Sequence, residues 1–164
     1  MTPEEHKEEL VRFLQDAHAM EEQSLQTLQA AVRVAGDPQL ESLYQGHVME
    51  TQTHLELLKY RLETHDASRS LVKDLGGRLT AAVHGAGVVS DRDTPAKLLA
   101  VAYSFEHFEI AMYELLKRVA DLAGDRDTVE MADKILVNER QAAEKLAASY
   151  DLALDRSLHG SVRA

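Results

Sequence analysis

Four long stretches of the sequence repeat apolar or small residues at steps of three and four, which is the spacing of one face of an α-helix. No stretch shows the alternation that is typical of a strand. Only three prolines occur in 164 residues, so long uninterrupted helices are allowed. The pattern predicts helices over about residues 3–35, 38–64, 95–123 and 128–155.

Local signals mark where these helices begin and end. Thr2 and Glu5 form the pair expected of a capping box at the start of the first helix. Gly36 is expected to end that helix, and Asp37, which is followed by a proline, is expected to cap the second. For the fourth helix we expect Asp127 as the N-cap.

The order of the helices indicates the fold. Two helical hairpins with short turns are separated by roughly 30 residues, and a weaker amphipathic pattern over about residues 67–84 predicts a short extra helix there. Two antiparallel pairs joined by a long crossover are typical of the ferritin-like four-helix bundle. We therefore expect an all-α ferritin-like fold with a helix in the crossover, in a single domain over residues 1–164.

Charge and composition narrow the function. The formal net charge is −10, which argues against binding to nucleic acid or to an anionic membrane surface. The absence of cysteine excludes disulfides and thiolate-bound metals. No signal sequence and no apolar run of membrane-spanning length is seen, so we expect a cytoplasmic protein without membrane or nucleic-acid partners.

Each of the four helical stripes carries a glutamate at a position where the spacing calls for a core residue: Glu21, Glu50, Glu109 and Glu139. Each lies about 12 to 15 residues from the turn of its hairpin, or about 20 Å along the helix. Packing the two hairpins together is therefore expected to bring four carboxylates to one level of the bundle interior.

Clustered buried carboxylates repel one another and lose their hydration, so they must hold protons or cations. A single inward glutamate or histidine is more often a misplaced helix boundary or an ordinary core residue, but four glutamates in matched registers favour a metal centre. His47, His54 and Glu106 project to the same side as these glutamates. The predicted metal ligands are Glu21, His47, Glu50, His54, Glu106, Glu109 and Glu139.

Two neighbouring residues leave alternatives open, and a third has a single expected position. His18 is either a ligand or a residue at the rim of the centre. Tyr113, one turn from Glu109, is either plain core, a hydrogen-bond partner of a ligand or a radical sink. His107 falls off the stripe, and we expect it on the outside.

Four segments resemble the YciF-type family of bacterial stress proteins, and the similarity covers about residues 8–152. The most specific segment is VAYSFEHFEIAMYELL in the third helix; the others are LQDAHAMEEQSLQTL, GHVMETQTHLELL and NERQAAEKL. The resemblance implies a ferritin-like di-metal protein, a homodimer and a bacterial stress setting. It implies no particular reaction, because the family has no settled one.

The chain departs from the wider ferritin-like pattern of Glu-x-x-His in each half. The second helix reads His-x-x-Glu-x-x-x-His, the fourth has no histidine near Glu139, and Ala143 stands where the family often has an acid. We therefore expect two unequal metal positions, one rich in nitrogen and one rich in carboxylate.

Two functions of different classes follow. The leading hypothesis is a stress-related oxidase or peroxidase with two metal ions, iron in the first place and manganese or zinc as alternatives, acting on Fe(II), O2 or peroxide. In it Glu50 and Glu109 approach both ions. The alternative is a metal-binding structural or interaction stress protein without turnover, and an iron-storage cage ranks below both.

Overall fold

The structure is a computed structural model that describes residues 2–67 and 94–159 of the chain. Across these two ranges it contains helices and no strand, which confirms the all-α prediction. The helices are α1 (Pro3–Val34), α2 (Pro38–Thr64), α4 (Thr94–Ala123), α5 (Arg126–Ala147) and α6 (Tyr150–His159).

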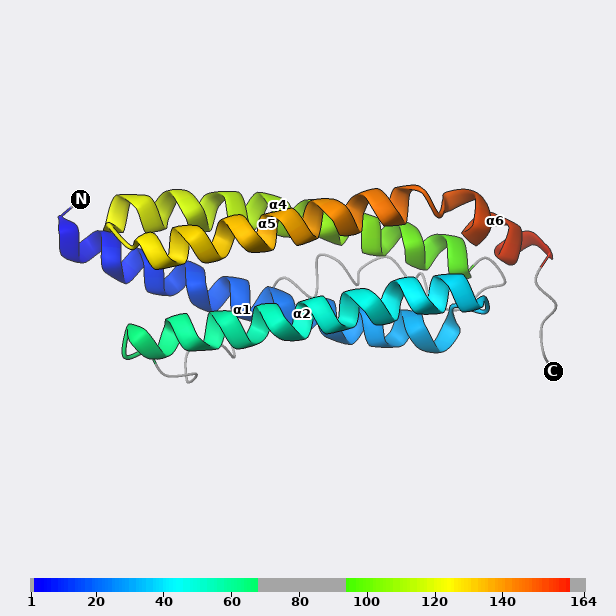
Figure 1. Cartoon of the computed structure of the whole chain (residues 1–164), viewed down its shortest axis with the longest axis horizontal. Coiled ribbons are helices and arrows are strands. Elements are labelled where there is room, and N and C mark those ends of the chain that lie inside the picture. The colour runs from blue at the N-terminus through cyan, green and yellow to red at the C-terminus, as the bar shows by residue number, and fades with distance from the viewer. Residues whose placement is uncertain (1, 68–93, 160–164) are drawn as a thin grey trace.

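Two antiparallel hairpins lie side by side and form the bundle (Figure 1). One consists of α1 and α2, and the other of α4 and α5. The helices α1 and α4 also pack closely, whereas α2 and α5 touch much less. The short helix expected in the crossover, over about residues 67–84, lies outside the described residues except for residue 67.

The first two caps are as predicted. Thr2 and Glu5 form a complete capping box, and the Asp37 carboxylate accepts hydrogen bonds from the first turn of α2. Glycines with positive φ follow α1 and α4, at Gly36 (66°) and Gly124 (75°). Such backbone favours glycine over residues with a Cβ atom, so the sequence marks both hairpin turns.

The fourth predicted helix needs two corrections. Its N-cap is Asp125 and not Asp127, because Asp125 directly follows the turn glycine and accepts a hydrogen bond from the Thr128 amide at 3.1 Å. The helix expected to run to about residue 155 ends at Ala147, and α6 follows after two residues. The break redirects the chain so that α6 packs on α4, where the Ser157 hydroxyl accepts from the Ala96 amide at 2.9 Å.

The core consists of two apolar clusters with a polar layer between them. One cluster includes Leu10, Leu14 and Leu116 and lies toward the α4–α5 turn. The other includes Leu40 and Leu99 and lies toward the α1–α2 turn. The polar layer therefore falls between two apolar clusters, and most of its side chains are buried.

A buried ion pair ties the α4–α5 turn to the end of α2. Nη2 of Arg61 donates to both Asp125 oxygens at 2.8 and 2.7 Å, and the two side chains are 9% and 11% exposed. We expect Arg61→Met to lower the free energy of unfolding of the metal-free protein by about 3 kcal/mol, because the Asp125 carboxylate then loses its guanidinium partner and keeps only His65 as an ion-pair partner, whose Nε2 lies 2.8 Å from Oδ2. Urea denaturation measures the loss.

The control for this substitution is Arg140→Met, which removes an exposed pair with Glu114 and should cost less than about 1 kcal/mol. Equal losses in the two variants would contradict a special role for the buried pair.

Candidate metal centre

Four carboxylates from three helices meet in the polar layer. Glu21 comes from α1, Glu106 and Glu109 come from adjacent turns of α4, and Glu139 comes from α5. All four residues are at most 1% exposed. Burying several carboxylates this closely is very unfavourable unless protons or cations accompany them.

The contribution of α2 is two histidines. His47 and His54 are seven residues apart, which is almost two full helical turns, so both face the carboxylates. They are 6% and 3% exposed. Nε2 of His47 lies 3.0 Å from Glu106 Oε2. Nδ1 of His54 lies 3.0 Å from Glu139 Oε1 and 3.3 Å from Glu21 Oε1.

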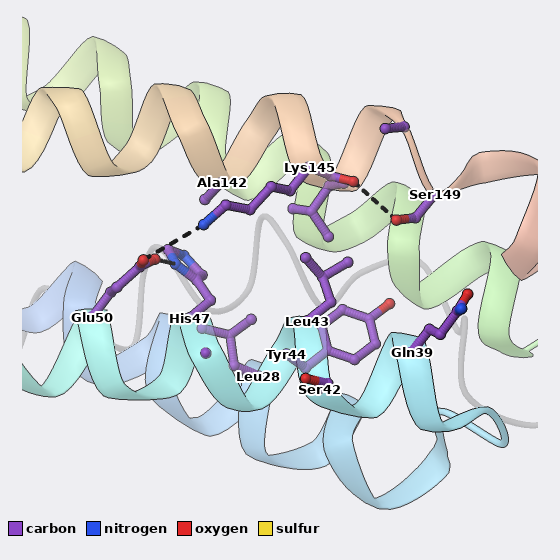
Figure 2. A pocket seen from close by; sticks show the side chains of 13 residues that line it. Leu28, Gln39, Ser42, Leu43, Tyr44, His47, Glu50, Ala142, Lys145 and Ser149 are labelled. Carbon is purple, nitrogen blue, oxygen red and sulfur yellow. Dashed lines mark hydrogen bonds and ion pairs between the residues drawn. The ribbon is translucent and has the colours of Figure 1, made fainter.

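Glu50 does not join the buried carboxylates, and the expected quartet with one acid per helix is corrected here. Its side chain is 29% exposed and lies at the rim, where Oε2 is 3.0 Å from His47 Nδ1 and Oε1 is 3.7 Å from Lys145 Nζ (Figure 2). On a helix Glu50 lies about 60° around the axis from His47 and about 40° from His54. In this structure that offset places its carboxylate at the edge of the interior, beside Lys145.

The inward groups form two overlapping sets of potential ligands. One ligand atom from each of His47, Glu106, Glu109 and Glu139 lies within 4.8 Å of the others, and the same holds for Glu21, His54 and Glu139. Glu139 belongs to both sets, whereas sequence reasoning gave the shared position to Glu50 and Glu109. Each set has one histidine, so the expected nitrogen-rich and carboxylate-rich positions differ only in having two or three carboxylates.

Many ligand atoms of this cluster lack a hydrogen bond within the described chain. The histidine nitrogens and the oxygens of Glu106 and Glu139 have ion-pair contacts with one another instead, whereas Glu21 Oε2 and the two Glu109 oxygens have none that the structure shows. Buried polar atoms without a hydrogen bond are rare in folded proteins. Oxygen and imidazole nitrogen are the donors that iron, manganese and zinc accept. The atoms without a hydrogen bond are Glu21 Oε2, His47 Nε2, His54 Nδ1, Glu106 Oε2 and both carboxylate oxygens of Glu109 and Glu139. The donor set therefore fits a metal centre.

The contact between Glu50 and His47 is also of the kind found around metals. A histidine that binds a metal through one nitrogen commonly gives its other N–H to a carboxylate, which fixes the tautomer and the ring orientation. Glu50 engages Nδ1 of His47 and leaves Nε2 directed at Glu106. Glu50 is thus placed to orient a ligand, even though it lies outside both sets.

The pKa values reflect a cluster that binds protons when metal is absent. Burial raises the pKa of Glu109, and its carboxylate neighbours raise it further. Burial likewise raises the pKa of Glu106, to about 7. Burial lowers the pKa of His47 and of His54, but their carboxylate contacts outweigh it and raise each to about 10. The buried carboxylates therefore stabilise a positive charge placed between them, which the protonated histidines supply when no metal ion is bound.

The structure also places Tyr113, His18 and His107 relative to the cluster. The Tyr113 hydroxyl donates to Glu21 Oε1 at 2.5 Å, so this fully buried tyrosine is a hydrogen-bond partner of the cluster. His18 is buried on α1 and its Nδ1 lies 3.9 Å from Glu22, outside both ligand sets. His107 is exposed, as expected, and stacks edge-on against Tyr103.

Comparison with known proteins agrees with this geometry. A family model described as a domain of unknown function, DUF892, matches residues 5–158. The chain belongs to the DUF892 family. A solved structure from Xanthomonas campestris pv. campestris is 28% identical to this DUF892 chain, with a TM-score of 0.78 over 94% of this chain and 96% of the other.

Two further structures share the fold at lower identity. The Escherichia coli stress protein YciF is 22% identical, with a TM-score of 0.69 over 98% of this chain and 99% of its own. A ferritin-like, diiron-carboxylate protein from Bacillus anthracis is 16% identical, with a TM-score of 0.73 over 92% and 99%. The YciF-type resemblance and the ferritin-like fold are confirmed, and the buried histidine and glutamate cluster fits metal binding.

In the two ranges that the structure describes, none of the helices combines the length and the apolar character needed to cross a membrane.

Proposed function

We propose that this DUF892 protein binds two transition-metal ions, iron in the first place, and uses them in redox chemistry with dioxygen or peroxide. One observation carries the proposal: two sets of buried histidine and glutamate ligands share Glu139. Manganese and zinc accept the same donors and are the alternatives. The Bacillus anthracis diiron-carboxylate protein, which has the same fold, supports the choice of iron.

The residues have distinct roles in this proposal. Glu21 and His54 would hold one ion, His47, Glu106 and Glu109 would hold the other, and Glu139 is placed to serve either. When bound, two ferrous ions would supply electrons to dioxygen or peroxide and become ferric. Glu50 orients His47, and Tyr113 holds Glu21 in place through its hydroxyl. The apolar clusters on either side exclude bulk water from the reacting groups.

The test is anaerobic titration with Fe(II), followed by addition of oxygen or peroxide. We expect two equivalents to bind and a ferric absorption band to develop within one turnover. Binding of fewer than two irons, together with no ferric absorption, would refute the proposal.

A metal-binding role without turnover is the second candidate. The potential ligands come from all four long helices, so bound ions would cross-link the bundle, including the loosely packed α2 and α5. This role predicts stoichiometric metal binding and a raised melting temperature, with peroxide consumption no faster than that of the metal-free protein. In either case we predict a homodimer, which size-exclusion chromatography measures.

A further inference from the structure

A pocket of about 430 Å³ opens between α2 and α5 and leads to the candidate metal centre (Figure 2). On α2 its lining runs from Gln39 to Glu50, and His47 belongs to it. His47 is the most exposed of the six ligands in the two sets, at 6%, and its Nε2 lies 3.0 Å from Glu106. The pocket therefore joins the molecular surface to a residue of the centre itself.

The seam between α2 and α5 is also the side on which the bundle packs least closely. These two helices touch much less than α1 and α2 or α4 and α5 do. Along the bundle axis, an apolar cluster lies on either side of the polar layer. An ion that crossed such a cluster would lose its water without gaining a ligand, which is very unfavourable. Entry between α2 and α5 avoids that cost.

Glu50 offers the carboxylate that an entering cation meets first. Its side chain is 29% exposed, whereas the four glutamates in the ligand sets are at most 1% exposed. Its Oε2 lies 3.0 Å from Nδ1 of His47, so a cation held by Glu50 has a ligand of the centre beside it. Carboxylate oxygen is a ligand that iron, manganese and zinc accept.

Lys145 competes for the same carboxylate from the opposite helix. Its Nζ lies 3.7 Å from Glu50 Oε1, which is longer than a hydrogen bond, and its side chain is 53% exposed (Figure 2). Exposed pairs of this kind contribute little stability, so a divalent cation can displace the ammonium group. Until it is displaced, its positive charge opposes the approach of the cation.

We propose that divalent cations enter the metal centre through this pocket, with Glu50 as their first ligand and Lys145 as a competing cation that slows their entry. The proposal rests on the metal binding in the proposed function and adds a route to it. It does not depend on redox chemistry, so a metal without turnover can test it.

Stopped-flow absorption of Co(II) binding to the metal-free full-length chain measures the rate of entry. Co(II) takes nitrogen and oxygen ligands, and its visible absorption changes when they replace water. We expect Lys145→Gln to take up Co(II) about threefold to fivefold faster at low ionic strength, as for loss of one exposed charge interaction, and still to bind two equivalents. Glu50→Gln should take it up several-fold more slowly. If Glu50 only oriented His47, the variant would change the dissociation of Co(II) and leave the association rate as it is.

Lys134→Gln is the matched control for Lys145→Gln. The two lysines are exposed and lie on α5, five and six residues from Glu139 in opposite directions. Lys134 lines a second pocket between α2 and α5, of about 220 Å³, whose lining contains neither His47 nor Glu50. Both variants change the net charge equally, so a long-range effect of charge would appear in both. We expect Lys134→Gln to take up Co(II) at close to the wild-type rate.

A variant that fills the pocket tests the route without changing a charge. Gly46 lines the pocket one turn before Glu50, and a Cβ atom added there would meet nothing within 4 Å. Gly46→Leu should therefore be accommodated and should slow Co(II) uptake. Thr53→Leu, at an exposed position of α2 outside the pocket lining, should not slow it. Circular dichroism checks that each variant is folded.

The route is overturned if Lys145→Gln takes up Co(II) at the wild-type rate, if Lys134→Gln speeds uptake as much, or if Gly46→Leu leaves the rate unchanged. Any of these results, with iron bound and oxidised as expected, would refute the route alone. Co(II) entry at the expected rates, with no ferric absorption in the iron titration, would refute only the redox function. A chain that binds neither Co(II) nor Fe(II) would overturn both proposals.

Discussion

Replacement of Glu139 by glutamine is expected to abolish tight binding of both metal ions. Glu139 is the residue that the two ligand sets have in common, so one substitution removes a carboxylate ligand from each. Removal of an outer partner of a metal ligand already weakens binding by roughly 10- to 100-fold, and loss of a shared ligand should cost more. Equilibrium dialysis with elemental analysis should show close to zero equivalents bound, against two for the wild type.

Variants at the unshared ligands make this result specific. Glu21→Gln and Glu106→Gln should each retain one of the two ions, since each residue belongs to a single set. Glu144→Gln changes an exposed acid on the same helix as Glu139 and should retain both. Two tightly bound equivalents in Glu139→Gln would rule out its shared position.

The metal-free stability gives a further check on the Glu139→Gln variant. Glutamine has nearly the shape of glutamate, but it removes the carboxylate that lies 3.0 Å from His54 Nδ1 and 3.6 Å from His47 Nε2, so the metal-free variant should be less stable than the wild type, by up to about 3 kcal/mol. Urea denaturation measures this loss, and unchanged stability would contradict a charge interaction between Glu139 and these histidines.

Rising pH is expected to destabilise the metal-free protein and to strengthen the stabilising effect of metal. The folded state raises the pKa of His47 and of His54 from 6.5 to about 10, and that of Glu106 from 4.5 to about 7. Groups with raised pKa values stabilise the fold fully below their ordinary pKa and lose this contribution as pH rises through the folded value. The glutamate contribution is lost between about pH 4.5 and 7, and the histidine contribution between about 6.5 and 10.

Metal ions should reverse this trend because they replace the protons of the cluster. A ligand at 1,000 times its dissociation constant stabilises a protein by about 4 kcal/mol, which corresponds to a rise in melting temperature of about 10 °C for a chain of this size. Scanning calorimetry with and without Mn(II), a redox-stable probe, measures the rise at pH 5.5 and 7.5. We expect the larger rise at pH 7.5, and a rise that is greater at pH 5.5 would contradict a proton-filled cluster.

Local sequence signals predicted most of the helical framework. The capping box at Thr2, the cap at Asp37 and the turn at Gly36 act through neighbouring residues, so they can be recognised without knowing the fold. The break before α6 could not be recognised in the same way. It depends on contacts with α4, such as that between Ser157 and Ala96, which are 61 residues apart in the chain, and the local pattern continues through the break.

Of the seven ligands predicted from the sequence, six lie in the two buried sets and Glu50 lies at the rim. Spacing along a helix fixes the direction of a side chain only to within a sector around the helix axis. Glu50 and the two histidines of α2 lie within one such sector, about 60° wide. Which of them faces inward depends on how α2 is rotated against its neighbours.

The sequence by itself determined the helical bundle and the level at which acids cluster, because both follow from periodicity and from distances along each helix. Tertiary structure alone decided that Glu139 is common to both ligand sets, that Glu50 orients His47, and that a pocket opens between α2 and α5. These features depend on helix rotation and on how loosely two helices pack. Such properties are set by side chains distant in the sequence and leave no local pattern.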